Sequence, residues 1–596
     1  MKSTLAKAGA AVFAVACTVA YTVACGGDPT NPDRPDPTSS NLGSMSVGDV
    51  RTLTFTQASG GLQIPAALSS AQYAIILGNS NVASPAIPSV TVHGDWMTSQ
   101  AVGPLASFAP PTGQSLSARG STTPRGAMFE ASLRNFERTQ LPRPGGATQS
   151  GGLVSLDKLP PAPSRATAPA VGATLQIKVL TPSGFNGTGS VNCSTGGFTV
   201  TTGKVRAVGK HALVVSDVTS PAGGFTDADF QGVADEFDSF TFPTDSAYFG
   251  SPTDLDNNDH IIIYYTPAVN RLTPTGDATS SGYVGGFFFA GDLYDPIAGS
   301  KGCLSSNKGE YFYLLAPDAS AINGNDFTAD FVRQVTRGTV AHEFQHMINS
   351  GNRYVSPTIS NFEATWLDEG LAHMAEDVVG RARAGFGDNF TVAFADVDKL
   401  SAPVLQAYFL QNFARTKYYV GRPDTTGAIV GTAKAANNLA SRGAEWAFLR
   451  YLDDWYSGTN PRILTRKLVA GPDTGTVNLT KSAGAPLDTL LSRWLVTMYT
   501  DHRSIPGLNA VYNYKSYTLR QLVAGTQLGN ENVSSYLPVK AIGDGRTTVQ
   551  ANVPGSSANY FLTSLTTGGA RTVTVTNSGG SAATDPNGRI YIVRQQ

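Results

Sequence analysis

The alternation of apolar and polar residues distinguishes the two ends of the chain from its centre. Near the start, Leu53–Thr56 alternates and Tyr73–Leu77 is a short apolar run. These patterns predict strands, so we expect a small β domain over residues 45–99. Near the end, Arg571–Thr576 alternates in the same way between turns rich in Gly, Ser and Asn, which predicts a β-sandwich-like unit over residues 531–596.

The centre of the chain, residues 173–530, changes from strand patterns to helix patterns. Apolar runs predict strands at 175–180, 198–208, 211–215, 260–265, 283–290 and 311–315. Helical periodicity then predicts helices at 327–349, 361–380 and 437–456. This order is typical of the α+β class, so we expect an α+β domain flanked by small all-β units.

Residues 100–172 have a different character, because Pro, Ser, Thr, Gly and Ala dominate them. Only 128–138 has a helical pattern within that stretch. We therefore interpret 100–172 as a low-complexity linker or a propeptide.

Composition and charge narrow the classes of function. The 596 residues contain 43 Lys and Arg against 44 Asp and Glu, giving a net charge of −1. A nucleic-acid-binding protein usually has a clear basic excess, so we expect no nucleic-acid partner. With 41% hydrophobic and only 15% charged residues, the chain can form a substantial core rather than remain disordered.

The first 25 residues have the features of an export signal. Two lysines precede an apolar stretch that is too short for a normal membrane span. Thr22–Cys25 resembles a lipoprotein cleavage box with Thr in place of the usual Leu, which predicts lipidation of Cys25; Cys17 is a weaker alternative. An ordinary cleaved signal is the other interpretation. The Pro-rich residues 26–44 fit a tether, so we expect an exported chain that is either held at the cell envelope by a lipid or secreted.

Cys193 and Cys303 remain once the two early cysteines are assigned to export. An oxidising compartment would allow them to pair, but spacing alone leaves a disulfide and two free thiols as equal alternatives.

The strongest chemical signal is His342-Glu343-Phe344-Gln345-His346 on the helix predicted at 327–349. Two histidines four residues apart project from the same face and can reach one Zn²⁺ ion. Glu343 would then point at water bound to the metal. The alternative interpretation, packed or surface histidines on an ordinary helix, is disfavoured because a second motif follows at a suitable distance.

That second motif lies on the helix predicted at 361–380. A catalytic zinc site keeps a third protein ligand and one open position, and Glu369 is the ligand that we favour. Helix pitch places His373 and Glu376 on the same face as Glu369, where they could hydrogen bond to the zinc ligands, as could Asp368. The alternative third ligands are Glu363, Asp368 and His373.

His342-Glu343-x-x-His346 followed by Trp366-Leu-Asp-Glu369-Gly-Leu-Ala resembles the gluzincin metallopeptidases, and more narrowly the hyicolysin-type family of secreted bacterial zinc peptidases. Residues 248–254, 282–287 and 442–450 share the likeness, which covers about 173–530.

The resemblance implies a mixed sheet over the active-site helices and an endopeptidase acting on proteins or peptides. It assigns His342, His346 and Glu369 to zinc and Glu343 to the general base. Asp368 departs from the Asn that many gluzincins have before the Glu ligand.

Peptide hydrolysis also needs a group that stabilises the oxyanion. Tyr418, Tyr419, Arg442 and His373 are the candidates, and the sequence does not separate them. Residues 282–290 could form an edge strand that pairs with substrate, or a buried strand with a bulge. We find no obvious anchor for a free N-terminus, so an endopeptidase is preferred to an aminopeptidase.

Residues 254–259 resemble the beginning of a calcium loop, with Asp254, Asp256 and Asn258 as candidate Ca²⁺ ligands. The loop lacks the Gly and Glu that such a motif has at its sixth and twelfth positions. An Asx-rich turn is the interpretation that we favour.

Two other functions compete with the zinc endopeptidase. The first is a surface binding or adhesion protein whose zinc domain is catalytically inactive, a role that the flanking β regions would suit. The second is a zinc hydrolase that acts on non-peptide amides or on the ends of peptides.

Overall fold

The computed structural model describes residues 42–65, 69–83, 88–94, 116–117, 124–142, 167–185, 191–279, 282–299, 302–356, 358–432, 438–528, 536–542, 548–565 and 570–596. The predicted signal peptide, Cys17, Cys25 and nearly all of the predicted tether lie outside these ranges, as does most of 100–172. The predicted α+β class is confirmed: a mixed sheet and a helical region are accompanied by further β sheets.

A mixed sheet forms one side of the central region, with its strands in the order β10-β11-β9-β8-β7-β6. The bounds are β6 Thr174–Leu180, β7 Phe198–Val208, β8 Ala212–Asp217, β9 Ile261–Thr266, β10 Gly286–Phe288 and β11 Tyr311–Leu315. The neighbours β8, β9 and β11 run parallel, and the other pairs are antiparallel. β9 is buried at every position, as expected for a parallel strand covered on both faces.

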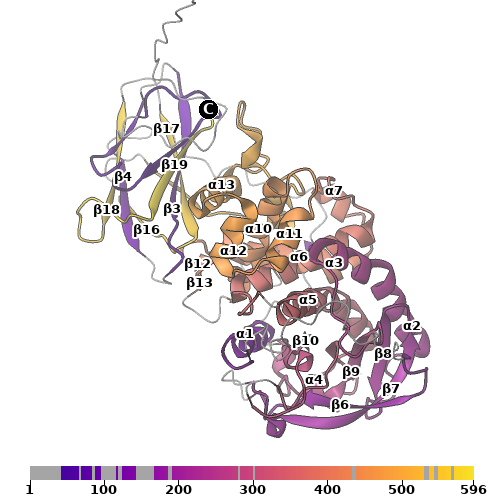
Figure 1. Ribbon diagram of the computed structural model, residues 1–596. Helices are drawn as coiled ribbons and strands as arrows, with labels where there is room; N and C mark the ends of the chain where they lie inside the picture. Colours follow the sequence, from indigo (N-terminus) through magenta and orange to yellow (C-terminus); the bar gives the residue numbers. More distant parts are fainter. Residues whose placement is uncertain are drawn as a thin grey trace, which may run out of the picture.

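Helices α5 (Ala329–Val355), α6 (Thr365–Ala384) and α10 (Asn438–Tyr456) confirm the three predicted helices, although α5 continues six residues beyond its predicted end and α6 lies four residues later than predicted. Thr328 caps α5 by accepting a hydrogen bond from the Phe331 N–H, and Gly385 ends α6 in the left-handed conformation. α6 contacts both α5 and α10, and α5 packs against β10 and β11. The helices lie between the mixed sheet and a second β region (Figure 1).

The remaining elements connect or cover this frame. They are α2 Asp227–Glu236, α3 Phe242–Phe249, α4 Pro267–Asn270, α7 Phe394–Val397, α8 Ala402–Val404, α9 Leu410–Val420, α11 Ile463–Ala470, α12 Gly475–Ala483, α13 Leu487–Thr500, α14 Leu519–Gly525, β5 Leu116–Ser117, β12 Thr426–Gly427, β13 Gly431–Thr432 and β14 Thr526–Gln527.

The two ends of the chain form one β sandwich rather than the two separate units that the sequence suggested. One sheet has the order β1-β19-β3-β17-β15 and the other β16-β4-β18-β2. The bounds are β1 Val50–Thr54, β2 Leu62–Ile64, β3 Ala71–Asn79, β4 Ser89–Gly94, β15 Val539–Ala541, β16 Thr548–Asn552, β17 Ser557–Leu565, β18 Arg571–Asn577 and β19 Gly588–Arg594. Each end of the chain contributes strands to both sheets, so the two apolar inner faces are complete only when the two ends pair.

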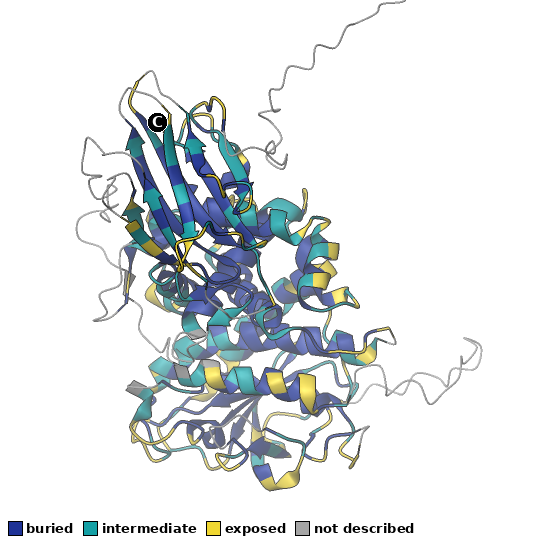
Figure 2. Ribbon diagram, turned by 90° about the vertical axis from the view of Figure 1, so that its left-hand side faces the viewer, coloured by how far each residue is buried: buried dark blue, intermediate teal, exposed yellow. Residues whose placement is uncertain are grey.

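The sandwich packs against the helical region through β3, β17, β19 and α13. Ser492 on α13 and Tyr591 on β19 hydrogen bond through their hydroxyls at 2.9 Å, and the Tyr560 hydroxyl donates to the Leu495 carbonyl at 3.2 Å. The buried core is continuous across this boundary, as the dark segments of Figure 2 illustrate.

Helix α1 (Pro124–Thr139) comes from the stretch interpreted as linker or propeptide. Phe129, Leu133 and Phe136 are fully buried in the same core as the mixed sheet and the helices. Phe129 packs edge-on against Phe287 of β10. This part of 100–172 is therefore a packed element of the fold.

Cys193 and Cys303 form a disulfide with an S–S distance of 2.12 Å, the first of the two alternatives. Among the described residues, none of the helices combines the length and the apolar character needed to cross a membrane.

Candidate metal centre

Helix α5 places its two histidines one turn apart on one face, with Glu343 beside them. His342 is 4% exposed, Glu343 1% and His346 0%. Glu369, on α6, reaches the same point and is 2% exposed. Ionisable side chains are rarely buried unless they are paired or bind a metal, so this burial needs an explanation in the site itself.

The three expected ligand atoms converge. His342 Nε2 and His346 Nε2 lie 3.2 Å apart. Glu369 Oε2 lies 3.5 Å from the first nitrogen and 3.8 Å from the second. Four ligands held tetrahedrally at about 2.0–2.1 Å from a zinc ion would be separated by about 3.4 Å. The observed spacing therefore fits one Zn²⁺ ion.

The protonation of the two rings supports the same conclusion. His342 Nδ1 lies 2.9 Å from Glu376 Oε1, and His346 Nδ1 lies 3.1 Å from Asp368 Oδ2. A carboxylate beside Nδ1 favours the tautomer with its proton there and leaves a lone pair on Nε2. Two lone pairs that face each other repel unless a cation lies between them, so a metal fits here.

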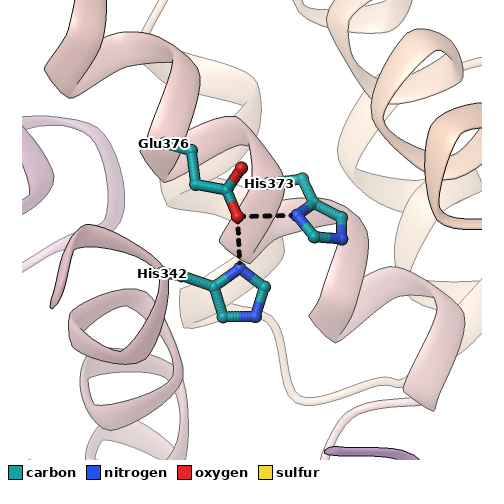
Figure 3. A group of neighbouring side chains, drawn as sticks. All are labelled: His342, His373 and Glu376. Carbon is teal, nitrogen blue, oxygen red and sulfur yellow. Dashed lines mark hydrogen bonds and ion pairs between the residues drawn. The ribbon is translucent and has the colours of Figure 1, made fainter. Parts of the chain in front are cut away.

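Glu376 also contacts a third histidine. Its Oε1 lies 2.9 Å from Nδ1 of both His342 and His373, so it sits between the two rings (Figure 3). Arg415 Nη1 donates to the other oxygen, Oε2, at 2.9 Å. His342, His373 and Glu376 could also group around an ion, but here both carboxylate oxygens already have hydrogen-bonding partners. We therefore assign Glu376 to orienting His342.

The cluster contains several carboxylates, so a bound cation would be stabilised there. Burial alone would lower the pKa of His342, but Glu369 and Glu376 outweigh it and raise the pKa to about 10. Burial alone would raise the pKa of Asp368, but His346 and Arg134 outweigh it and lower the pKa to about 2. Asp368 and Glu369 are thus charged, while burial lowers the pKa of His346. Without a metal the His342 ring carries a proton, and a cation bound between the two rings would take the place of that proton.

Glu343 is tied to the edge of the mixed sheet. Its Oε2 accepts a hydrogen bond from the Phe288 N–H of β10 at 2.9 Å, while Oε1 has no partner among the described residues. Burial raises the pKa of Glu343 to about 8, although His342 counteracts this. The carboxylate lines an open cleft whose walls include His342, Tyr283 and Gly285.

Arg442 and α1 complete the cleft. Arg442 Nη1 donates to Glu369 Oε2 and to Glu130 Oε2 on α1, each at 2.5 Å. Glu130 Oε2 lies 3.9 Å from His342 Nε2. Arg134, also on α1, is buried and donates to Asp368 Oδ2 at 3.2 Å. Arg442 is thus at the site, where it holds a ligand carboxylate.

Other candidates lie elsewhere. Tyr419 is buried with its ring stacked on Trp494 and its hydroxyl 3.3 Å from Ser557, facing the sandwich. Tyr418 packs beside Arg422 and does not line the cleft. Neither tyrosine is therefore placed to stabilise an oxyanion in this arrangement, because α9 directs both away from the metal ligands.

Glu363 was an alternative third ligand, but its carboxylate is bound to other groups of the protein. Its Oε2 accepts from Arg353 Nη2 at 2.7 Å, and its Oε1 accepts from the Gly475 N–H at 2.6 Å. This buried ion pair anchors the segment that leads into α6.

Four residues at or beside the site were not among the candidates from the sequence: Glu130, Arg134, Tyr283 and Arg415. Glu130 and Arg134 belong to the helical pattern at 128–138, but nothing in that pattern indicates that the helix reaches the metal ligands. Arg415 lies three residues before Tyr418, in a segment where only the two tyrosines were candidates. Tyr283 belongs to residues 282–290, predicted either to pair with substrate or to form a buried strand, and this is the only local signal for its position.

In the alternative interpretation of residues 254–259 as a calcium loop, Asn258 is not placed as a ligand. Asn258 Oδ1 accepts from the His260 N–H at 2.6 Å, and the Asn258 amide donates to Asp256. Asp254 and Asp256 group instead with Glu310, which directly precedes β11. The Asx-turn interpretation describes the backbone correctly, because the Asn258 N–H donates to the Asp256 side chain, two residues earlier, at 3.2 Å.

Comparisons with known proteins agree with this geometry. No family model matches the chain. The chain is 29% identical over 151 residues to the neutral metalloprotease ShpI of Staphylococcus hyicus, an alignment that covers 25% of this chain and 31% of that protein. The chain thus spans about a third of the length of this relative. The distant, partial similarity and the buried His-His-Glu cluster together suggest a zinc peptidase.

Proposed function

We propose that this protein is a zinc-dependent endopeptidase that hydrolyses amide bonds in proteins or peptides. The observation that carries the proposal is the convergence of His342, His346 and Glu369 beside Glu343 on an open cleft. When bound, Zn²⁺ lowers the pKa of a coordinated water molecule and polarises a carbonyl group. Proton transfer and the positioning of the metal ligands are carried out by side chains of this chain.

Glu343 acts as the general base. Its pKa, raised by burial to about 8, suits a group that takes a proton from water and returns it to the leaving amine. The Phe288 N–H holds Oε2, so Oε1 remains to carry the proton. Because the same backbone belongs to β10, the base is fixed relative to the strand beside the cleft.

The groups around the ligands keep them in place. Asp368 and Glu376 orient the two histidines, and Arg442 holds Glu369. Arg415 in turn holds Glu376. Partners of this kind fix ligand geometry and tautomer. His373 is neutral because burial and Arg415 lower its pKa to about 3, and it lies behind Glu376 rather than toward the cleft lining.

An endopeptidase is favoured by the position of the cleft. β10 ends the mixed sheet among the described strands, and Gly285, which precedes it, lines the cleft. An extended substrate can add to such an edge without presenting a terminus. We propose this pairing as the mode by which peptide substrates bind.

We also propose that the enzyme is exported, and this part of the proposal rests on the sequence alone. The signal peptide and lipidation of Cys25 would place the enzyme at the cell envelope, anchored only by lipid. The competing function, an inactive surface binding protein, shares that location and uses the sandwich as its binding module.

A peptide series with blocked and free termini tests the proposal. We expect cleavage of internal bonds in peptides blocked at both ends, loss of cleavage on treatment with a zinc chelator and recovery on adding Zn²⁺. Cleavage restricted to free termini would contradict the endopeptidase assignment. Absence of any cleavage by zinc-loaded protein would favour the binding function.

A further inference from the structure

Three carboxylates converge at a second place, where the loop after α3 meets the start of β11. Ligand oxygens of Asp254, Asp256 and Glu310 all lie within 4.8 Å of one another. Oxygen ligands at 2.3–2.6 Å from a Ca²⁺ ion are separated by at most about 5 Å. One ion can therefore contact all three side chains.

Glu310 supplies an observation independent of the acidic cluster. The residue is 1% exposed, and its Oε2 has no hydrogen-bond partner among the described residues. Its Oε1 is satisfied by the Thr253 hydroxyl at 2.7 Å and the Leu255 N–H at 3.0 Å. A buried carboxylate oxygen without a partner costs considerable free energy unless a cation or a proton compensates it.

Among the described residues, no lysine or arginine side chain compensates this charge. No ion pair within the described part of the chain joins Asp254, Asp256 or Glu310 to a lysine or arginine. The hydrogen bonds that reach the two aspartates come from Asn258 and from the Asp259 N–H.

We infer that Asp254, Asp256 and Glu310 bind one Ca²⁺ ion, at a site distinct from the zinc centre. Ca²⁺ is preferred because its ligands are hard oxygens and because it accepts the irregular geometry of a loop, whereas Mg²⁺ requires a near-ideal octahedron. The site does not depend on the proposed peptidase activity.

The ion would stabilise the support behind α5. Thr253, which donates to Glu310, lies against Gly351 of α5, where an added Cβ would be 3.0 Å from the threonine side chain. Asn352 of α5 also donates to the Ser251 carbonyl at 3.2 Å. Ca²⁺ would therefore link the loop, β11 and the last turns of the helix that carries the zinc histidines.

The test measures Ca²⁺ binding to the full, zinc-saturated chain by isothermal titration, together with the midpoint of thermal unfolding. We expect one Ca²⁺ per chain with a Kd between about 10⁻⁶ and 10⁻³ M, and a higher midpoint when Ca²⁺ is present. Glu310→Gln and Asp256→Asn should each weaken binding at least about tenfold and remove the thermal effect.

Asp259→Asn is the matched control, because it removes one negative charge from the same loop outside the proposed ligand set. It should bind Ca²⁺ as the wild type does. The inference is overturned if wild type binds no Ca²⁺ at 10 mM, if Asp259→Asn weakens binding as much as the other variants, or if Mg²⁺ binds more tightly than Ca²⁺. Zinc content, measured on each variant, shows that the fold is retained; if Glu310→Gln does not fold, Asp256→Asn decides the question.

Discussion

Replacing Asp368 by Asn should weaken zinc binding without removing a ligand. Asp368 Oδ2 lies 3.1 Å from His346 Nδ1 and accepts from Arg134. These partners lower the pKa of Asp368 from 3.8 to about 2, so they favour its charged form by roughly 2 kcal/mol, since one pKa unit is about 1.4 kcal/mol. The charged form of Asp368 therefore stabilises the folded chain at neutral pH, and this contribution to the free energy of unfolding is lost as the pH falls through the folded-state pKa.

Two quantities should therefore change in Asp368→Asn at pH 7. The free energy of unfolding of the metal-free chain should fall by about 2 kcal/mol. The zinc affinity, measured by competition with a chromogenic chelator, should fall by about 10–100-fold, the usual effect of losing the partner of a metal-bound histidine.

Glu363→Gln is the matched control, because Glu363 is an equally buried acid near the beginning of α6 whose partner, Arg353, does not contact the metal ligands. It should lower stability and leave zinc affinity unchanged. The reasoning would be refuted if Asp368→Asn bound zinc as tightly as wild type, or if Glu363→Gln weakened zinc binding equally.

Three further changes probe stability. Arg134→Met should lower the free energy of unfolding by about 3–5 kcal/mol in urea, because it leaves two buried carboxylates without their cation; a loss below about 1 kcal/mol would show that α1 is not held by this residue. Replacing both Cys193 and Cys303 by Ser should cost about 2–5 kcal/mol, since the disulfide closes a loop with a sequence separation of 110, and the same urea titration of reduced wild type should match it. Asp245 is fully buried without a hydrogen-bond partner among the described residues, and burial raises its pKa well above 3.8. Its stabilising effect is present below that value and lost as the pH rises, so Asp245→Asn should equal wild type near pH 4 and exceed it in thermal midpoint at pH 8; identical pH profiles would contradict the burial of this carboxyl.

The convergence of the candidate zinc ligands could be predicted because their geometry is local. A separation of four residues fixes His342 and His346 on one helix face whatever the rest of the fold does. Glu369 followed from the need for a third ligand and from the resemblance of its motif. The three main helices could also be predicted, because each is long and its apolar residues recur with helical periodicity.

Long-range pairing could not be predicted. β3 lies between β17 and β19, strands from the opposite end of the chain, and its apolar run is equally compatible with many partners. Tyr419 was a reasonable candidate from its chemistry, but its ring is stacked on Trp494 of α13, a tertiary contact that the sequence does not reveal. Glu130 belongs to a helix in a segment of low complexity, and only tertiary contacts bring it to Arg442.

The central claim is that Glu343 is the base of a zinc peptidase, and Glu343→Gln tests it most directly. Zinc content and casein hydrolysis should be measured together on wild type, on this variant and on Glu363→Gln. We expect about one zinc per chain in all three, hydrolysis by wild type and Glu363→Gln, and a loss of at least about 100-fold in Glu343→Gln. Equal hydrolysis by wild type and Glu343→Gln, or a wild-type chain that binds no zinc, would contradict the account.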